Sequence, residues 1–185
     1  AHHGGPAPPQ RHDNLSGACR PVCGRGAGGS SDGGRTNAAE VTALRDAQTH
    51  RGPDDAGLWL SEDATVGLGH RRLSIIDLDS GRQPLANEDG SVQVVFNGEI
   101  YNTDDLRRSL GSVSWRGHSA TEVLIEHIAR YGVPATLKAA KGTCALGCWN
   151  GHESERWLAR DRVGEKPLYY GQHQGTFLFA SEVQA

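Results

Sequence analysis

Short apolar runs separated by polar, glycine-containing breaks make up most of the chain after residue 36. Runs of this length between turn-forming residues predict β-strands. Several of them are apolar on both faces, which indicates strands that are covered on both sides. Two sheets packed face to face, with helices outside, would satisfy this pattern. The expected strands are 57–60, 65–69, 73–76, 92–96, 143–149, 156–159 and 177–180.

Helix-start signals stand between these runs. Asn37 and Ser119 are each followed three residues later by a glutamate, the pattern of a capping box. The first predicts a helix over 37–48. The second predicts a helix that ends at Gly132, because glycine readily terminates helices, and a shorter helix is expected over 104–110. The sides expected to face the core carry Val41 and Leu44 in the first helix, and Val123, Leu124, Ile128 and Tyr131 in the second.

Composition sets the first residues apart from the rest. Gly, Pro, Ser, Arg and His dominate residues 1–35, which predicts no folded structure there. The whole chain has 185 residues, enough for one domain with a core of its own. Its net charge of -3 gives no electrostatic case for binding nucleic acid or an anionic membrane. No apolar run approaches the roughly 18 residues of a membrane-spanning helix, so we expect a cytoplasmic protein.

Four cysteines raise the question of a metal site. Cys19 and Cys23 form one C-x3-C pair, and Cys144 and Cys148 form another. Residues four apart in a strand lie roughly 13 Å from each other, too far to share one zinc ion. We therefore favour buried thiols that act as small hydrophobic side chains over a zinc site or a disulfide framework.

Four polar, glycine-containing segments adjoin the apolar strands. Each has an ordinary structural interpretation by itself: Asn97-Gly98 as a hairpin turn, Arg160-Asp161 as an ion pair. Taken together, in this order and spacing, they resemble the N-terminal domain of glutamine-dependent asparagine synthetases, which are class II amidotransferases. The segments are HRGPD at 50–54, GHRRLSIID at 69–77, FNGEIYN at 96–102 and ARDRVGEKPLYY at 159–170, and the final FASEV at 179–183 also matches.

The resemblance implies an α+β fold, a four-layer α/β/β/α sandwich of the N-terminal-nucleophile hydrolase type. It implies an amidotransferase domain at 23–185, preceded at 1–22 by a low-complexity tail or a mis-called start. The chain would be cut before a synthetase domain that uses ATP and Mg²⁺, and no cofactor is expected in the domain itself. The implied partners are L-glutamine and the synthetase domain, with a homodimer left open.

The resemblance also assigns roles. Cys23 would be the nucleophile, with its own free α-amine as the base. The Asn97 side-chain amide and the Gly98 backbone N–H would form the oxyanion hole, and Arg72 would hold the α-carboxylate of glutamine. Ammonia released in this way would amidate aspartate in the synthetase domain. The remaining residues expected to line the substrate pocket are Leu73, Ser74, Ile75, Ile76, Glu99 and Ala120.

Three departures from the family pattern favour an alternative. Cys23 is internal, so either Val22 marks the true start or a propeptide is removed after it. Arg25 makes a poor buried first strand. Ala120 stands where the family has an aspartate that holds the substrate's α-ammonium. The alternative is a catalytically impaired, glutamine-binding or structural domain, and a small metal-binding protein is a third, weaker interpretation.

Overall fold

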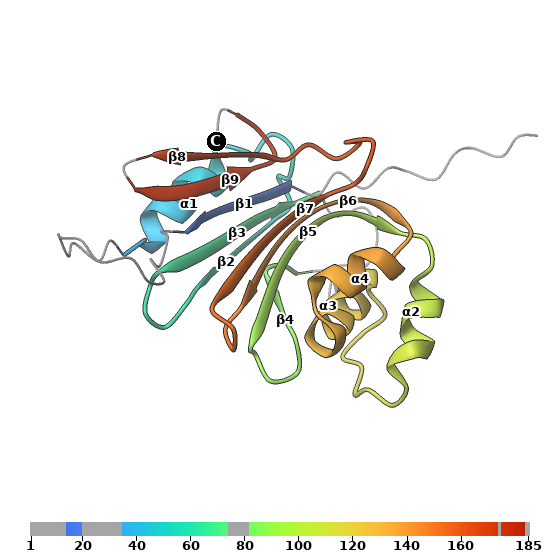
Figure 1. The fold of residues 1–185 in the computed structure, drawn as a ribbon. Helices are drawn as coiled ribbons and strands as arrows, with labels where there is room; N and C mark the ends of the chain where they lie inside the picture. Colours follow the sequence, from blue (N-terminus) through green and yellow to red (C-terminus); the bar gives the residue numbers. More distant parts are fainter. Residues whose placement is uncertain (1–13, 20–34, 74–81, 174, 184–185) are drawn as a thin grey trace, which may run out of the picture.

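The computed structural model describes residues 14–19, 35–73, 82–173 and 175–183. Within these ranges the strands form two antiparallel sheets, and the helices cover their outer faces (Figure 1). The first sheet has the strand order β2-β3-β1-β9-β8. Its strands are β1 (Asn14–Cys19), β2 (Asp55–Leu60), β3 (Val66–Arg72), β8 (Tyr169–His173) and β9 (Thr176–Ala180).

The second sheet has the strand order β4-β5-β6-β7. β5 and β6 pair along their whole lengths, so that Asn97 lies opposite Ala145 and Gly98 opposite Cys144. This register places the Asn-Gly segment inside a central strand, whereas the segment taken by itself suggested a hairpin turn. The strands are β4 (Leu85–Ala86), β5 (Val92–Ile100), β6 (Gly142–Asn150) and β7 (Glu155–Arg160).

The helices complete four layers. α1 packs on β1, β2 and β3, and α3 packs on β4 and β5, with α2 and α4 beside it. The order helix, sheet, sheet, helix confirms the predicted α/β/β/α sandwich. The helices are α1 (Ala38–Asp46), α2 (Thr103–Leu110), α3 (Ala120–Tyr131) and α4 (Val133–Ala139).

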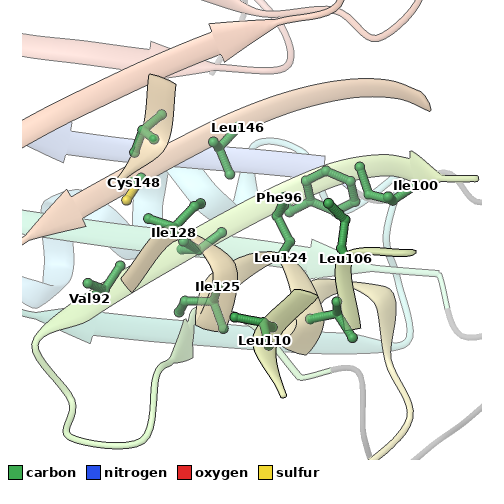
Figure 2. Packing of buried hydrophobic residues seen from close by; sticks show 13 residues of the cluster. Val92, Phe96, Ile100, Leu106, Leu110, Leu124, Ile125, Ile128, Leu146 and Cys148 are labelled. Atoms are coloured by element: carbon green, nitrogen blue, oxygen red, sulfur yellow. The ribbon is translucent and has the colours of Figure 1, made fainter. Parts of the chain in front are cut away.

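The larger buried cluster lies between the second sheet and its helices (Figure 2). Phe96 and Leu146 from the sheet meet Leu124 and Ile128 from α3 there. A second cluster fills the space between the sheets. Strands of the second sheet are thus buried on both faces, as their uninterrupted apolar runs predicted. The members of the second cluster are Leu68, Val95, Ala145 and Phe179.

Some expectations were wrong. β1 lies within the glycine-rich segment that predicted no structure, because its neighbours β3 and β9 supply the pairing that its composition does not indicate. Tyr131 is 43% exposed, so it is not a core residue. Leu73 follows β3 outside any strand, and the rest of the strand expected over 73–76 lies outside the described residues. The elements β4, β8 and α4 were not predicted.

No helix in the described ranges is long and apolar enough to cross a membrane.

Candidate functional site

Asn97 and Gly98 form a buried corner near the end of β5. Asn97 is 1% exposed, and its Oδ1 has no hydrogen-bond partner among the described residues. A buried polar atom without a partner costs about 1–3 kcal/mol, so it calls for an explanation. The two ends of a carboxamide can exchange by a half-turn, so this position can present either an acceptor or an N–H donor.

Gly98 is a position where only glycine fits. Its φ is +156°. A Cβ at this position would collide with the Thr143 carbonyl oxygen and with the backbone of Cys144 on the paired strand. The absence of a side chain lets β5 and β6 approach closely and leaves the main chain at this corner accessible from the other side.

Gln83 and His70 surround the start of this corner. The Gln83 side chain donates to the Phe96 carbonyl at 3.0 Å and accepts from the Phe96 N–H at 2.6 Å, so it holds the residue before Asn97 by both main-chain groups. Burial lowers the pKa of His70 to about 3, and the positive charge of Arg72 acts in the same direction. Neither Gln83 nor His70 was among the residues predicted for the site. An isolated glutamine carries no sequence signal that its partner is a distant strand.

Arg72 lies at the end of β3, next to the first polar segment. Its carbonyl accepts from the Asp54 N–H at 3.0 Å, and Pro53 bridges to it in parallel. Gly52 approaches so closely that a Cβ there would lie 2.6 Å from the Arg72 nitrogen. Arg72 itself is only 5% exposed. These contacts fix the main chain of Arg72 at the end of β3.

The segment at 179–183 also reaches this edge of the first sheet. Glu182 forms ion pairs with Arg51 at 3.2 Å and with His50 at 3.1 Å. Segments 50–54, 71–73 and 181–182 therefore converge, although they are far apart in the sequence. The fold supplies the proximity that their joint resemblance implied.

A cavity of about 420 Å³ lies beside the Gly98 corner. Gly98 and Glu99 line it from β5, and Ala120 lines it from the first residue of α3. His118 and Asp104 complete its polar wall. Three of the predicted pocket residues are thus brought together. Arg72 and Leu73 are not part of this cavity's described wall.

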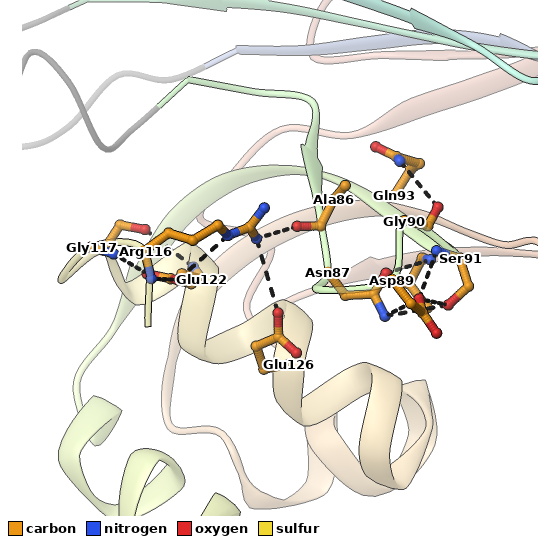
Figure 3. A network of polar contacts seen from close by, with 12 residues as sticks. Ala86, Asn87, Asp89, Gly90, Ser91, Gln93, Arg116, Gly117, Glu122 and Glu126 are labelled. Carbon is orange, nitrogen blue, oxygen red and sulfur yellow. Dashed lines mark hydrogen bonds and ion pairs between the residues drawn. The ribbon is translucent and has the colours of Figure 1, made fainter. Parts of the chain in front are cut away.

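Glu122 orients the loop before α3, at Arg116 and Gly117 (Figure 3). Its carboxylate is 3% exposed and accepts from the main-chain N–H groups of Arg116 at 2.6 Å and Gly117 at 3.0 Å. The expected capping box is therefore half correct. The Ser119 hydroxyl accepts from the Glu122 N–H, but the carboxylate binds the preceding loop instead of returning to Ser119.

The Arg116 side chain extends this network. Its guanidinium lies 3.7 Å from Glu122 and 3.9 Å from Glu126, and it donates to the Ala86 carbonyl. Burial raises the pKa of Glu126. The network ties the loop before α3 to strand β4, so the wall of the cavity is anchored to the sheet.

Arg160 and Asp161 do not form the predicted ion pair. Arg160 donates to the Lys166 carbonyl at 2.7 Å, whereas Asp161 accepts from the N–H groups of Glu165 at 2.9 Å and Lys166 at 3.1 Å. Burial acts to raise the pKa of Asp161, but these main-chain donors outweigh it and lower the pKa. Both side chains shape the 161–166 turn instead of bonding to each other.

Cys144 and Cys148 have little thiolate character. Burial raises the pKa of Cys144 to about 11, helped by the negative charge of Asp161, and burial raises that of Cys148 to about 12. Both thiols are free. Neither therefore has the lowered pKa of an activated nucleophile.

The model of one known family, the glutamine amidotransferase domain, matches residues 22–185. The chain belongs to this family. Similar relatives include asparagine synthetase [glutamine-hydrolyzing] 2 of Bacillus subtilis, 38% identical over 78% of this chain and 19% of the relative. Asparagine synthetase [glutamine-hydrolyzing] 1 of the same organism is 43% identical over 72% of this chain and 21% of the relative. Amidase chry2 of Gibberella zeae is 38% identical over 79% of this chain and 22% of that protein.

The amidotransferase domain thus spans about a fifth of the length of these relatives. Its fold is similar to that of the glutamine phosphoribosylpyrophosphate (PRPP) amidotransferase from B. subtilis, with a TM-score of 0.70, 22% identity, and coverage of 91% of this chain and 42% of the other. At that identity the likeness concerns the fold alone.

Some predicted site residues of the amidotransferase domain lie outside the described residues. These are Cys23, Ser74, Ile75 and Ile76. That the Cys23 thiol lies at the Asn97 corner therefore stays a prediction, as does the boundary of the domain at residue 22.

Proposed function

We propose that this domain hydrolyses glutamine to glutamate and ammonia, and that it supplies the ammonia to a synthetase domain that amidates aspartate. The Gly98 corner carries the proposal. It combines a buried Asn97 carboxamide, whose one end has no partner among the described residues, with a glycine that tolerates no side chain, beside a cavity of about 420 Å³. Oxyanion holes need this kind of fixed polar group at an accessible main chain.

The reaction would start at Cys23. Its thiolate attacks the carboxamide carbon of glutamine, and the Asn97 amide and Gly98 N–H stabilise the negative charge that develops on oxygen. The C–N bond then breaks, and the nitrogen takes the proton that the Cys23 α-amine had accepted from the thiol. Ammonia departs, and the glutamyl group stays bound to Cys23 as a thioester. Water attacks the thioester, and glutamate and the free thiol are released. An α-amine suits this role because its ordinary pKa is near 8.

Substrate recognition would use charged and pocket-lining residues near Asn97 and Gly98. Arg72 would bind the α-carboxylate, and Leu73, Ser74, Ile75 and Ile76 would line the pocket with Glu99 and Ala120. ATP and Mg²⁺ would be bound by the synthetase domain. We place the protein in the cytoplasm, since the free thiols of Cys144 and Cys148 suit a reducing compartment. A homodimer can be tested by sedimentation.

A glutaminase assay on the natively expressed chain tests the proposal, together with the intact mass of the product. We expect glutamate release, and no activity in Cys23→Ala. The expected mature chain begins at Cys23 and so lacks β1 (Asn14–Cys19), and another segment must then pair between β3 and β9. Cys148→Ala is the matched control, because it removes a free thiol that stays in the mature chain, and it should keep the activity. Activity that survives Cys23→Ala would refute the assignment. Glutamine binding without hydrolysis would indicate the impaired, glutamine-binding alternative.

A further inference from the structure

Gln83 takes the place of a strand residue at the outer edge of β5. It is 5% exposed, and its side chain bonds to both the carbonyl and the N–H of Phe96. A carboxamide carries an acceptor and N–H donors, so it can pair with a strand as main chain would. β4 itself pairs only with Gln93 and Val94. Pro84, which has no main-chain N–H, lies between β4 and Gln83. The side chain therefore continues the pairing of β5 beyond β4.

The Gly98 N–H belongs to the edge that Gln83 borders. Alternate residues of an antiparallel strand present their main-chain groups to the same edge. Tyr101, an odd-numbered residue, donates its N–H to the Lys141 carbonyl at 2.7 Å, on the side of β6. Phe96 bonds to Gln83 on the opposite side. Gly98 is two residues after Phe96, so its N–H is the next donor on that side, just past Gln83.

The paired strand agrees with this direction. Cys144 lies opposite Gly98, and its carbonyl accepts at 2.7 Å from the N–H of Asp161, the residue that follows β7. Residues whose main chains point away from each other form the non-hydrogen-bonded pairs of an antiparallel ladder. The Gly98 N–H therefore points away from β6.

Gln83 is itself fixed from the first sheet. Gly57 on β2 lies so close that a Cβ there would collide with the Gln83 carbonyl oxygen. His70 on β3, which is opposite Gly57 and 1% exposed, hydrogen-bonds through its ring to the Phe96 main chain. The main chain at Phe96 is thus held by buried groups that are supported by the other sheet, and the position of Gln83 sets the position of Phe96.

We propose that Gln83 is a positioning residue for the oxyanion hole. By holding Phe96, it sets the direction of the next two groups of β5, which are the Asn97 carboxamide and the Gly98 N–H. It would act through this main chain and not by contact with glutamine. Donors that are fixed before the reaction stabilise the developing charge without reorganisation, and a misplacement of about 1 Å can cost about a hundredfold in rate. This inference rests on the proposed glutaminase function.

A purely structural role is the competing interpretation, and Asn87 supplies the matched control. Asn87 is 6% exposed, and its Oδ1 accepts from the Val92 N–H at 2.8 Å. This is also a side chain that pairs with the main chain of β5, but Val92 is the first residue of the strand, far along it from Gly98. Loss of either side chain should weaken the sheet, whereas only loss of Gln83 should disturb the oxyanion hole.

Steady-state glutaminase kinetics of the full chain separate the two roles. Gln83→Met keeps the length of the side chain and removes both hydrogen bonds. We expect kcat to fall about tenfold to hundredfold and KM to stay within about threefold, because the oxyanion forms only during the reaction. Asn87→Leu should lower the urea midpoint and leave kcat and KM unchanged. If Gln83→Met does not fold, Gln83→Asn replaces it with the same expected split, since its carboxamide is one methylene short of Phe96.

Each outcome bears on one of the two proposals. An unchanged kcat in the folded Gln83 variant, a rise in KM alone, or an equal fall of kcat in Asn87→Leu overturns this inference and leaves the glutaminase proposal standing. An unsubstituted chain that releases no glutamate overturns both.

Discussion

His70 provides a direct test of how the site is buried. Its side chain lies on β3, is 1% exposed, and has an Nε2 without a hydrogen-bond partner among the described residues. Burial and, to a lesser extent, the Arg72 charge lower its pKa from 6.5 to about 3, while Asp55 and the Phe96 main chain oppose the change. The folded protein therefore keeps this imidazole neutral where an unfolded chain would protonate it.

The sign and size of the effect follow from this difference. Below pH 6.5 the unfolded state binds a proton at His70 that the folded state does not bind until about pH 3. The free energy of unfolding is therefore lost as the pH falls through this window, by about 1.4 kcal/mol for each pH unit. Between pH 6.5 and 4.5 the loss is about 2–3 kcal/mol, a large part of a domain's typical stability.

Urea unfolding at a series of pH values from 7.5 to 4.5 measures this slope. His70→Gln keeps a neutral polar side chain and removes the titration, so its slope should be smaller by about one proton. His152→Gln is the control, because the His152 side chain is 73% exposed. An unchanged slope in His70→Gln, or an imidazole that titrates near pH 6 by NMR in the folded chain, would refute the reasoning. His127, whose pKa is also lowered by burial, contributes equally in both proteins.

Three further perturbations follow from the same geometry. Glu122→Ala removes a buried acceptor of two main-chain N–H groups and an ion-pair partner, and it should cost about 3 kcal/mol of unfolding free energy in urea titrations followed by circular dichroism. Gly98→Ala places a Cβ against β6, and it should cost at least about 2 kcal/mol in thermal unfolding and abolish glutamine hydrolysis. Cys144 and Cys148, with pKa values raised to about 11 and about 12, should react slowly with a disulfide reagent at pH 8 when the other cysteines are alanine. Their rates should rise about tenfold for each pH unit up to about pH 10, because the thiolate is the reactive form.

Matched variants keep these predictions specific. Glu126→Ala removes the outer partner of Arg116, 3.9 Å away, and an acceptor of the Glu88 main chain, so its cost should be smaller, at about 1 kcal/mol. Gly171→Ala is the control for Gly98, because a Cβ at position 171 meets nothing within 4 Å. Equal losses within either pair would mean that burial and collision do not explain the effects. A thiol rate independent of pH would contradict the raised pKa values.

Local sequence determined many of the elements. The Asn37 cap with its glutamate starts α1, and the Ser119 hydroxyl starts α3, because capping uses atoms within one turn of the helix. Uninterrupted apolar runs predicted β5 and β6, since a strand between two layers has no solvent-facing side. The polar segments and their order indicated the family, because each segment carries its own residue types.

The choice among several possible hydrogen-bond partners was decided only by the tertiary structure. The Glu122 carboxylate turned to the preceding loop, and Arg160 and Asp161 bound main-chain groups instead of each other. In each case several partners were chemically equivalent, and packing selected among them. β1 formed in a segment of unpromising composition because two neighbouring strands offered their edges.

The cavity shows the same division most clearly. The sequence named Gly98 and Ala120 as site residues and showed that position 120 lacks its acid. That Asp104 faces the same space followed only from the fold, which turns α2 beside the end of β5 and brings α3 against both. The sequence gives the chemical type of each side chain. Which charged or polar groups lie near it depends on how the helices and sheets pack.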